Sequence, residues 1–159
     1  MSLPDGWLTD VEAAELRRLA AGKTVLELGA WKGRSTVVLA GVAAHVVSVD
    51  RHEGIAEVGG DDSLPDYLQA VRGLRNVSVV IADFEQIVPL LGFFKMVYVD
   101  GNHDADTVAR DTEFAVMHAV EVVAFHDWDF ASVREGVARV IAGNPDSVQG
   151  SVASFRIIT

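Results

Sequence analysis

The sequence predicts a doubly wound α/β domain with a mostly parallel sheet. Wholly apolar runs at residues 96–99 and 122–125 are bounded by polar residues, which is typical of buried parallel strands. A strand at residues 24–28, a glycine turn, a helix and a strand at residues 45–49 follow one another as in a βαβ unit. Strands and helices alternate along the rest of the chain, so we expect a single domain over residues 1–159.

Local signals then place each element. Thr9 and Glu12 form a capping-box pattern that starts the first helix, and Gly22 ends it. Residues 52–64 are the one long irregular segment, which we expect to be mobile. Pro89 keeps a short helix irregular. We expect helices over residues 10–21, 34–43, 65–74, 84–91, 105–119 and 133–141, and strands over residues 24–28, 45–49, 77–81, 96–99, 122–125 and, as one strand or a tight pair, 148–158.

The composition argues against several classes of function. Half of the residues are hydrophobic, which allows a dense core. The net charge of −10 argues against nucleic acid as the main partner. No apolar stretch reaches ~18 residues, so we expect no membrane span. The absence of cysteine excludes disulfides, thiolate zinc sites and a thiol nucleophile, and it suits a cytoplasmic protein.

The turn after the first predicted strand has the features of a nucleoside site. Gly29 allows a tight turn beside a ligand, and Gly33 lets the next helix start close to the sheet. Asp50 ends the second strand, where a carboxylate accepts hydrogen bonds from both ribose hydroxyls. Trp31 replaces the second glycine of a dinucleotide fingerprint, which disfavours NAD. Glu27 would repel phosphate and attract a cationic amino group.

These residues resemble the motifs of class I S-adenosylmethionine-dependent methyltransferases, and the resemblance covers nearly the whole chain. Glu27, Gly29 and Gly33 resemble the first motif, which meets the methionine part of the cofactor, and Asp50 resembles the ribose-binding acid. The resemblance implies a Rossmann-like sheet whose last strand is antiparallel. The cofactor contacts that it implies are Glu27, Gly29, Ala30, Trp31, Gly33, Ser35, Asp50, Arg51, Asp83, Phe84 and Asp100.

The segment after the third predicted strand carries a further part of this resemblance. Residues 82–84 resemble the motif that receives the adenine. The resemblance implies that Asp83 accepts a hydrogen bond from the exocyclic amine and that Phe84 packs on the ring.

A second group of polar residues follows the fourth and fifth predicted strands. Asp100 and His103 come after the fourth strand, and His126 and Asp127 come after the fifth. Because α/β proteins bind ligands at the carboxyl edge of a parallel sheet, we expect these residues to converge there. Two aspartates and two histidines can hold a divalent metal and also move a proton.

This second group resembles the metal-dependent small-molecule O-methyltransferases, especially those that act on macrolide and aminocoumarin sugars. The resemblance implies Mg²⁺ ligands at Asp100, His126 and Asp127. A histidine at position 126 departs from the acid or amide of the catechol-type enzymes, so either it orients Asp127 or the metal is softer, such as Mn²⁺ or Fe²⁺. His103 stands where those enzymes place a lysine base. Asn102 stands where some sugar methyltransferases place an acid, which leaves His103 the better base, with Asp127 or water as the other route for the proton.

The sequence therefore predicts an S-adenosylmethionine-dependent O-methyltransferase that acts on a small hydroxylated molecule, such as a sugar or polyol, with a divalent cation. The alternatives are a non-catalytic S-adenosylmethionine- or metal-binding module and, less favoured, an NAD-linked oxidoreductase. Relatives usually cover the substrate with extra N-terminal helices or inserts. Here only residues 7–21 and 52–64 are available, so the pocket is either open or completed by a second copy in a homo-oligomer.

Each of these residues also has a purely structural explanation. Asp50, Asp83 and Asp127 can cap the elements that follow them. His103 can bond to backbone at a helix start, and His126 can be a satisfied core histidine.

Other residues have weaker signals. Glu27 can be an inward polar residue satisfied by backbone. Trp128 either lines the substrate mouth or plugs the edge of the sheet. We expect His45 to start a strand, His118 to end a helix, and His52 to be solvated together with Asp61 and Asp62, whose loop can alternatively form a lid.

Overall fold

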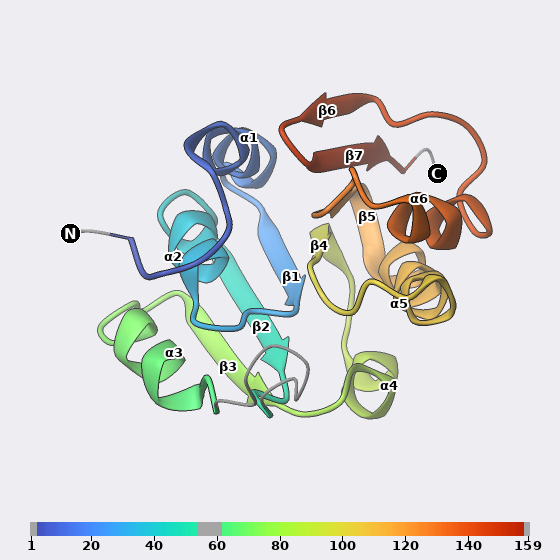
Figure 1. The fold of residues 1–159 in the computed structure, drawn as a ribbon. Coiled ribbons are helices and arrows are strands. Elements are labelled where there is room, and N and C mark those ends of the chain that lie inside the picture. The colour runs from blue at the N-terminus through green and yellow to red at the C-terminus, as the bar shows by residue number, and fades with distance from the viewer. Residues whose placement is uncertain (1–2, 54–61, 158–159) are drawn as a thin grey trace.

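The computed structural model describes residues 3–53 and 62–157, which form a seven-stranded sheet with helices on both faces (Figure 1). The strands are β1 (Thr24–Leu28), β2 (His45–Asp50), β3 (Val77–Ile81), β4 (Phe94–Val99), β5 (Ala119–Phe125), β6 (Ser147–Gln149) and β7 (Val152–Arg156). The helices are α1 (Asp10–Ala20), α2 (Arg34–Ala40), α3 (Leu64–Val71), α4 (Phe84–Ile87) with the 3-10 turn η2 (Val88–Leu90), α5 (Ala105–His118) and α6 (Ala131–Ala138).

The strand order β3-β2-β1-β4-β5-β7-β6 confirms the predicted fold class. Strands β1 to β5 run parallel, β7 pairs antiparallel with β5, and β6 and β7 form the tight pair that closes the sheet. Leu28 lies beside Val49 and Val99, and Val99 lies beside Phe125. Because these four residues end or nearly end their strands at one level, the polar residues that follow them share one edge of the sheet.

The two faces of the sheet have separate cores (Figure 1). Val25 packs with α1 and α2 on one face, and Leu26 and Leu28 pack with α5 and α6 on the other. Each such fully buried side chain contributes roughly 1.5–3 kcal/mol. Helices α5 and α6 approach closely because Gly136 lacks a side chain: a Cβ there would lie 2.6 Å from the Cβ of Val108.

The predicted boundaries of three helices were wrong. Helix α2 ends at Ala40, α3 at Val71 and α6 at Ala138, each three residues before the predicted end. The apolar pattern continues past these ends because residues in the following turns, such as Val42 and Leu74, still pack against the core. Apolar periodicity therefore marks which residues face the core, and it does not mark where the helical backbone stops.

The fourth and fifth strands begin before the apolar runs that predicted them. Strand β4 begins at Phe94, and β5 begins at Ala119, which was expected to end the preceding helix but has extended backbone. Lys95 and Glu121 lie within these strands and form an ion pair of 3.2 Å. A search for wholly apolar runs stops at such charged residues, although a strand end that faces water tolerates them.

His52 is buried, and the expectation that it is solvated was wrong. Its side chain is only 4% exposed, its Nδ1 lies 3.0 Å from Oγ of Ser63, and its ring lies 4.4 Å from that of Tyr67. The ring fills space under α3 instead of facing water. The rest of the segment expected to be mobile or to form a lid, including Asp61, lies largely outside the described residues.

The capping box of Thr9 and Glu12 is present at the start of α1, as predicted. Within the described part of the chain, no helix has both the length and the apolar character needed to cross a membrane.

Candidate functional site

The turn after β1 is packed against the segment that follows β4. Gly29 has a φ of +92°, and a Cβ there would lie 2.0 Å from the carbonyl oxygen of Asp100. The N–H of Gly29 donates to Val49, and the N–H of Asp100 donates to Leu28. Only glycine fits this close approach, which joins the nucleoside-type turn to the segment that carries Asp100.

Asp50 links the end of β2 to the same turn. Its Oδ2 accepts the N–H groups of Ala30 at 2.7 Å and Trp31 at 2.9 Å, and its Oδ1 accepts the N–H of His52 at 2.7 Å. The carboxylate therefore stabilises mainly the turn after β1, which precedes Asp50 in the chain, rather than the start of an element that follows it. An ionised carboxylate has about four acceptor positions, so Oδ1 keeps room for a further donor.

Glu27 lies beneath the turn and is fully buried. Its two carboxylate oxygens accept the hydroxyls of Ser35 and Thr36, each at 2.6 Å. Burial raises the pKa of Glu27 to about 7, and these hydroxyls oppose the rise. Side-chain hydroxyls of α2 thus satisfy Glu27, not the backbone groups considered from the sequence. Gly33, with a φ of +87°, begins this helix against Tyr67.

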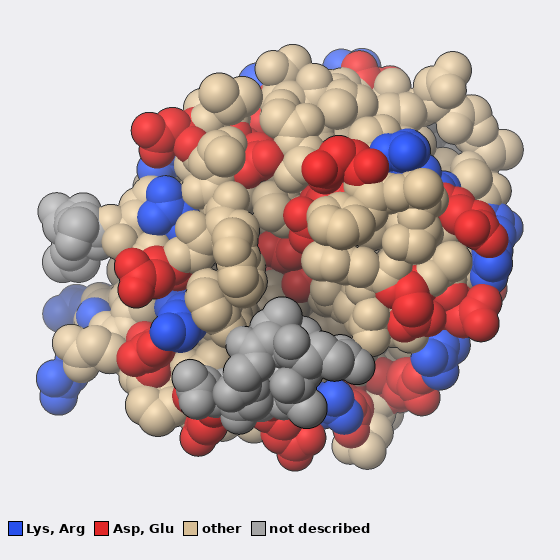
Figure 2. Space-filling view, viewed as in Figure 1, with Lys and Arg blue, Asp and Glu red and all other residues tan. Residues whose placement is uncertain are grey.

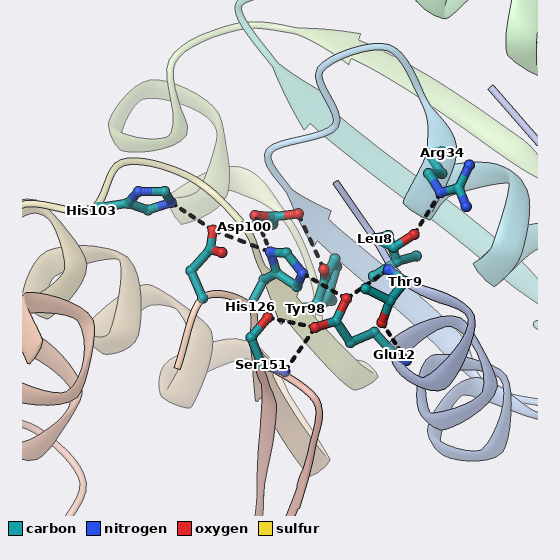
Figure 3. Close-up of polar contacts among 10 residues, drawn as sticks. Leu8, Thr9, Glu12, Arg34, Tyr98, Asp100, His103, His126 and Ser151 are labelled. Carbon is teal, nitrogen blue, oxygen red and sulfur yellow. Dashed lines mark hydrogen bonds and ion pairs between the residues drawn. The ribbon is translucent and has the colours of Figure 1, made fainter. Parts of the chain in front are cut away.

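An aromatic pair lies beside the turn. Trp31 has an unusual φ of +43°, and its ring stacks on Trp7 with centroids 4.4 Å apart. Arg34 holds the N-terminal segment in place by donating to the carbonyls of Pro4 and Leu8, the second of which Figure 3 shows. The segment that precedes α1 is thereby fixed next to the turn.

The segment after β3 is tied to the tip of β2. The N–H of Ala82 donates to the carbonyl of Asp50 at 3.2 Å. Asp83 does not cap α4 through its side chain, so that structural explanation was wrong; its Oδ1 lies 3.1 Å from Nη1 of Arg51. Phe84 packs partly on the core, with its ring edge toward Gly101.

His126 lies buried among three carboxylates, as Figure 3 shows for the two that are labelled, Asp100 and Glu12. Its Nδ1 lies 3.3 Å from Oδ1 of Asp100 and 3.2 Å from Oδ2 of Asp127, and its Nε2 lies 3.5 Å from Oε2 of Glu12. Burial disfavours a charged ring, but the hydrogen bonds to Asp100 and Asp127 outweigh it and raise the pKa of His126 to about 11. The residue is therefore a buried imidazolium that compensates carboxylates.

His103 is half-exposed and lies on the other side of Asp127. Its Nε2 lies 2.8 Å from Oδ2 of Asp127, and its ring stacks on Phe130 at 4.9 Å. The hydrogen bond to Asp127 raises the pKa of His103. The side chain that caps α5 is Asp104, which accepts the N–H of Thr107, so the explanation of His103 as a helix-start residue bonded to backbone was wrong.

Asp127 does not cap the helix that follows it. Its φ is +55°, and its side chain points to the two histidines. Burial raises the pKa of this carboxyl, but the hydrogen bonds from His103 and His126 lower it far more. Trp128 packs edge-on against Phe155 at 5.7 Å, which favours its explanation as a plug at the edge of the sheet.

Among the described residues, Asp100, His103 and Asp127 form a group that could hold a metal ion. One ligand atom from each lies within 4.8 Å of the others. His126, which the resemblance implied as a ligand, is outside this group and contacts both carboxylates from behind. Two carboxylate oxygens and an imidazole nitrogen suit Mg²⁺, Mn²⁺ or Fe²⁺. Figure 2 shows a hollow on this face with acidic side chains at its floor, where Figure 1 shows the ends of β1 and β4.

Glu12 was not recognised as a site residue from the sequence. Its Oε1 accepts the N–H and the hydroxyl of Ser151, each at 2.7 Å, and its Oε2 accepts the N–H of Thr9. Burial raises the pKa of Glu12, but the backbone hydrogen bonds from Thr9 and Ser151 lower it more, to about 2. Its burial was indicated by its position along the chain. Glu12 lies four residues from both Leu8 and Leu16, so helical periodicity puts it on the same buried face as these leucines.

Tyr98 and Asp111 were also missed. Tyr98 is fully buried and donates its hydroxyl to Oδ2 of Asp100 at 3.2 Å. Asp111 is 4% exposed on the buried face of α5, between Val108 and Ala115, and burial raises its pKa to about 7. For Asp111, the sequence again indicated burial, because this acid occupies a position of the predicted helix where the periodicity calls for an apolar residue.

Comparisons with known proteins bear on the family and on the fold. The sequence model of a family described as a methyltransferase domain matches residues 26–128, which run from β1 to the residues after β5. None of the curated proteins compared with the chain matches it.

Several solved structures share the fold. Cofactor-bound Rv0187 from MTB is 22% identical with a TM-score of 0.69, and the match covers 96% of this chain and 82% of that one. The O-methyltransferase TomG from Streptomyces achromogenes, in complex with SAM, is 21% identical with a TM-score of 0.62, covering 86% and 69%. An O-methyltransferase from Bacillus cereus in complex with SAH is 18% identical with a TM-score of 0.61, covering 89% and 66%.

Proposed function

Because the chain belongs to the methyltransferase-domain family, we propose that it transfers a methyl group from S-adenosylmethionine to a hydroxyl oxygen of a small molecule, such as a sugar or polyol, with the help of a divalent cation. The observation that carries this proposal is the grouping of Asp100, His103 and Asp127, packed against the glycine turn after β1. Two of the similar structures are O-methyltransferases, which supports oxygen as the acceptor atom.

The residues beside the turn fit a nucleoside cofactor. Asp50 would accept a hydrogen bond from a ribose hydroxyl at the acceptor position that remains on its Oδ1. Asp83 and Phe84 would lie beside the base. Glu27 and Ser35 bind each other under the turn, so we assign them to holding the turn in shape. Bound S-adenosylmethionine would supply a methyl group on a positively charged sulfur.

The carboxylates of Asp100 and Asp127 would hold the cation, since anionic oxygens are the ligands that Mg²⁺ and Mn²⁺ prefer. A bound cation lowers the pKa of a hydroxyl that it contacts. His126 holds both carboxylates in place from behind through its Nδ1. This buried positive charge also limits the repulsion between the two acids.

His103 would act as the general base. Its half-exposed imidazole is the titratable group at the open side of the cluster, and it can pass a proton on to water. A neutral His103 that donates its Nε2–H to Asp127 has Nδ1 as its free acceptor. The acceptor proton would go to Nδ1 of His103 as the hydroxyl oxygen takes up the methyl group, and the electron pair of the C–S bond that breaks would stay on the cofactor.

Calorimetry with S-adenosylhomocysteine and with NAD, each with and without Mg²⁺, tests the cofactor assignment. We expect S-adenosylhomocysteine to bind and NAD not to bind. NAD binding alone would favour an oxidoreductase. If S-adenosylhomocysteine binds but labelled methyl groups pass to none of a panel of sugars, polyols and catechols, with Mg²⁺ or Mn²⁺ present, the domain is a binding module.

A further inference from the structure

Asp111 is a buried acid with no hydrogen-bond partner among the described residues. Its side chain lies on the inner face of α5 and is 4% exposed. Within residues 3–53 and 62–157, no hydrogen bond reaches its carboxylate, and the neighbouring Arg110 is bonded to Glu85 and Thr107 instead. Burying an unpaired carboxylate is costly, so such groups normally have a partner. Burial raises the pKa of Asp111 to about 7, because it disfavours the charged form of the carboxyl group.

The carboxylate of Asp111 faces the segment that follows β4. A Cβ placed on Gly101 would lie 3.3 Å from Oδ2 of Asp111 and 3.2 Å from Cε2 of Phe84. The acid of α5 and the aromatic ring of α4 therefore both point to the one residue of this segment that has no side chain. Any other residue at position 101 would cover them.

This position lies next to the place proposed for the nucleoside. The hydrogen bond from Ala82 to Asp50 joins the tip of β2 to the segment that leads to Phe84. A ribose held by Asp50 would therefore direct its base toward Phe84, and the base edge toward Asp111.

Asp83 is the other acid near the base, but its surroundings differ. Its side chain is 43% exposed and forms an ion pair with Arg51. A hydrogen bond to a solvated and already paired carboxylate adds little, whereas a bond to a buried and unpaired one adds much more.

We propose that Asp111 accepts a hydrogen bond from the exocyclic amino group of the adenine, and that Gly101 leaves the space through which the base reaches it. This assignment rests on the proposed function, because it requires an adenosyl cofactor with its ribose on Asp50. Asp111 would thereby determine specificity for adenine over bases that carry an oxygen in place of this amino group.

The test measures the affinity ratio between S-adenosylhomocysteine and its deaminated analogue S-inosylhomocysteine by calorimetry. Asp111→Leu removes the acceptor and places an apolar side chain in a buried position, and it should lower the ratio at least about tenfold. Asp111→Asn should also lower the ratio, because the amide can accept from the amino group of adenine or donate to the oxygen of the inosyl base. Asp83→Asn, at the other acid beside the base, should lower the ratio less than either Asp111 variant does. The matched control Glu113→Gln, an exposed acid on the same helix as Asp111, should keep the wild-type ratio.

Two results would overturn the assignment while leaving the proposed function intact. In the first, the wild-type protein binds S-adenosylhomocysteine and both Asp111 variants keep its ratio. In the second, Asp83→Asn is the only variant that lowers the affinity ratio. A wild-type protein that binds no S-adenosylhomocysteine would overturn the proposed function, and this assignment with it.

Discussion

Oδ2 of Asp127 lies 2.8 Å from Nε2 of His103, and the same oxygen lies 3.2 Å from Nδ1 of His126. One carboxylate oxygen is thus shared between a half-exposed imidazole and a buried one. The buried ring of His126 keeps its charge because carboxylates surround it, whereas the ring of His103 is half-exposed to water. The two histidines therefore have different roles, although both follow a strand end in the sequence.

Replacing His103 by alanine should lower turnover by ~10²–10⁴-fold with little change in cofactor affinity, because a general base acts on the transition state. The base must be neutral, so turnover should rise with pH. Asp127 raises the pKa of His103, so the midpoint should lie above the ordinary value. The measurement is a pH–rate profile of the wild type and of His103→Lys, which should keep part of the activity. An alanine variant with normal turnover and the same profile would make His103 structural.

Asp100→Asn should weaken Mn²⁺ or Mg²⁺ binding more than His126→Asn does. The first change removes an anionic ligand oxygen, and the second removes only a group that holds the ligands in place, which typically costs 10–100-fold. Calorimetry with the metal alone gives both affinities. A third variant, His103→Ala, distinguishes two roles of this histidine. Unchanged metal affinity would indicate that His103 is a base only, and a loss of metal affinity would indicate that it is a third metal ligand. If no variant alters metal binding, the cation lies elsewhere.

Asp50→Ala should weaken S-adenosylhomocysteine binding by roughly 1.5–3 kcal/mol, because a hydrogen bond to a charged group is lost. It should also destabilise the turn, since Ala30, Trp31 and His52 lose their acceptor. Asp50→Asn keeps one acceptor oxygen and serves as the control for folding. Unfolding and binding are measured on the same samples. A folded variant with unchanged affinity would remove Asp50 from the cofactor site.

Local patterns were enough to place the elements and the edge of the sheet where the site lies. The bounds of β1 and β3 agree with the prediction, since each is a short apolar run between clear stop signals. Asp50 ends its strand, and Asp100 and His126 follow theirs directly. Parallel pairing alone brings such residues to one edge of the sheet. These conclusions need only the order of the elements.

Contacts between distant parts of the chain could not be predicted in this way. Ser151 and Glu12 are 139 residues apart, and their hydrogen bonds exist because β7 pairs with β5 and lies next to α1. Which histidine is buried behind the carboxylates depends on the same packing, so the sequence pattern did not distinguish His126 from His103. The helical phase of Glu12 and Asp111 indicated burial, but it did not indicate their neighbours.

Glu12→Gln should lower the free energy of unfolding at neutral pH by about 1–3 kcal/mol, because an amide replaces an acceptor that is bonded to Thr9 and Ser151 and faces His126. The pKa of Glu12 is lowered to about 2 in the folded protein, so its contribution is present above the ordinary value of 4.5 and is lost as pH falls toward 2. Urea unfolding between pH 2 and 7 measures this. The comparison variant Thr9→Ala removes the hydroxyl that caps α1, which also makes the smallest contribution to lowering the pKa of Glu12, so its cost should change much less with pH. A Glu12→Gln cost independent of pH would contradict the prediction.

Asp111→Asn should make the unliganded protein more stable at neutral pH, and the gain should grow with pH. The pKa of Asp111 is raised from its ordinary 3.8 to about 7, so between these values the unfolded chain has lost a proton that the folded protein still holds. Stability therefore falls as pH rises through this range and levels off above about 7, and the asparagine variant lacks this part of the fall. Glu27, whose pKa is also raised to about 7, leaves part of the slope in both proteins. Urea unfolding from pH 4 to 8 should show curves that meet near pH 4 and separate by a few kcal/mol at pH 8, with Glu113→Gln following the wild type. Parallel curves would mean that Asp111 ionises at its ordinary pH, and that its carboxylate already has a partner in the free protein.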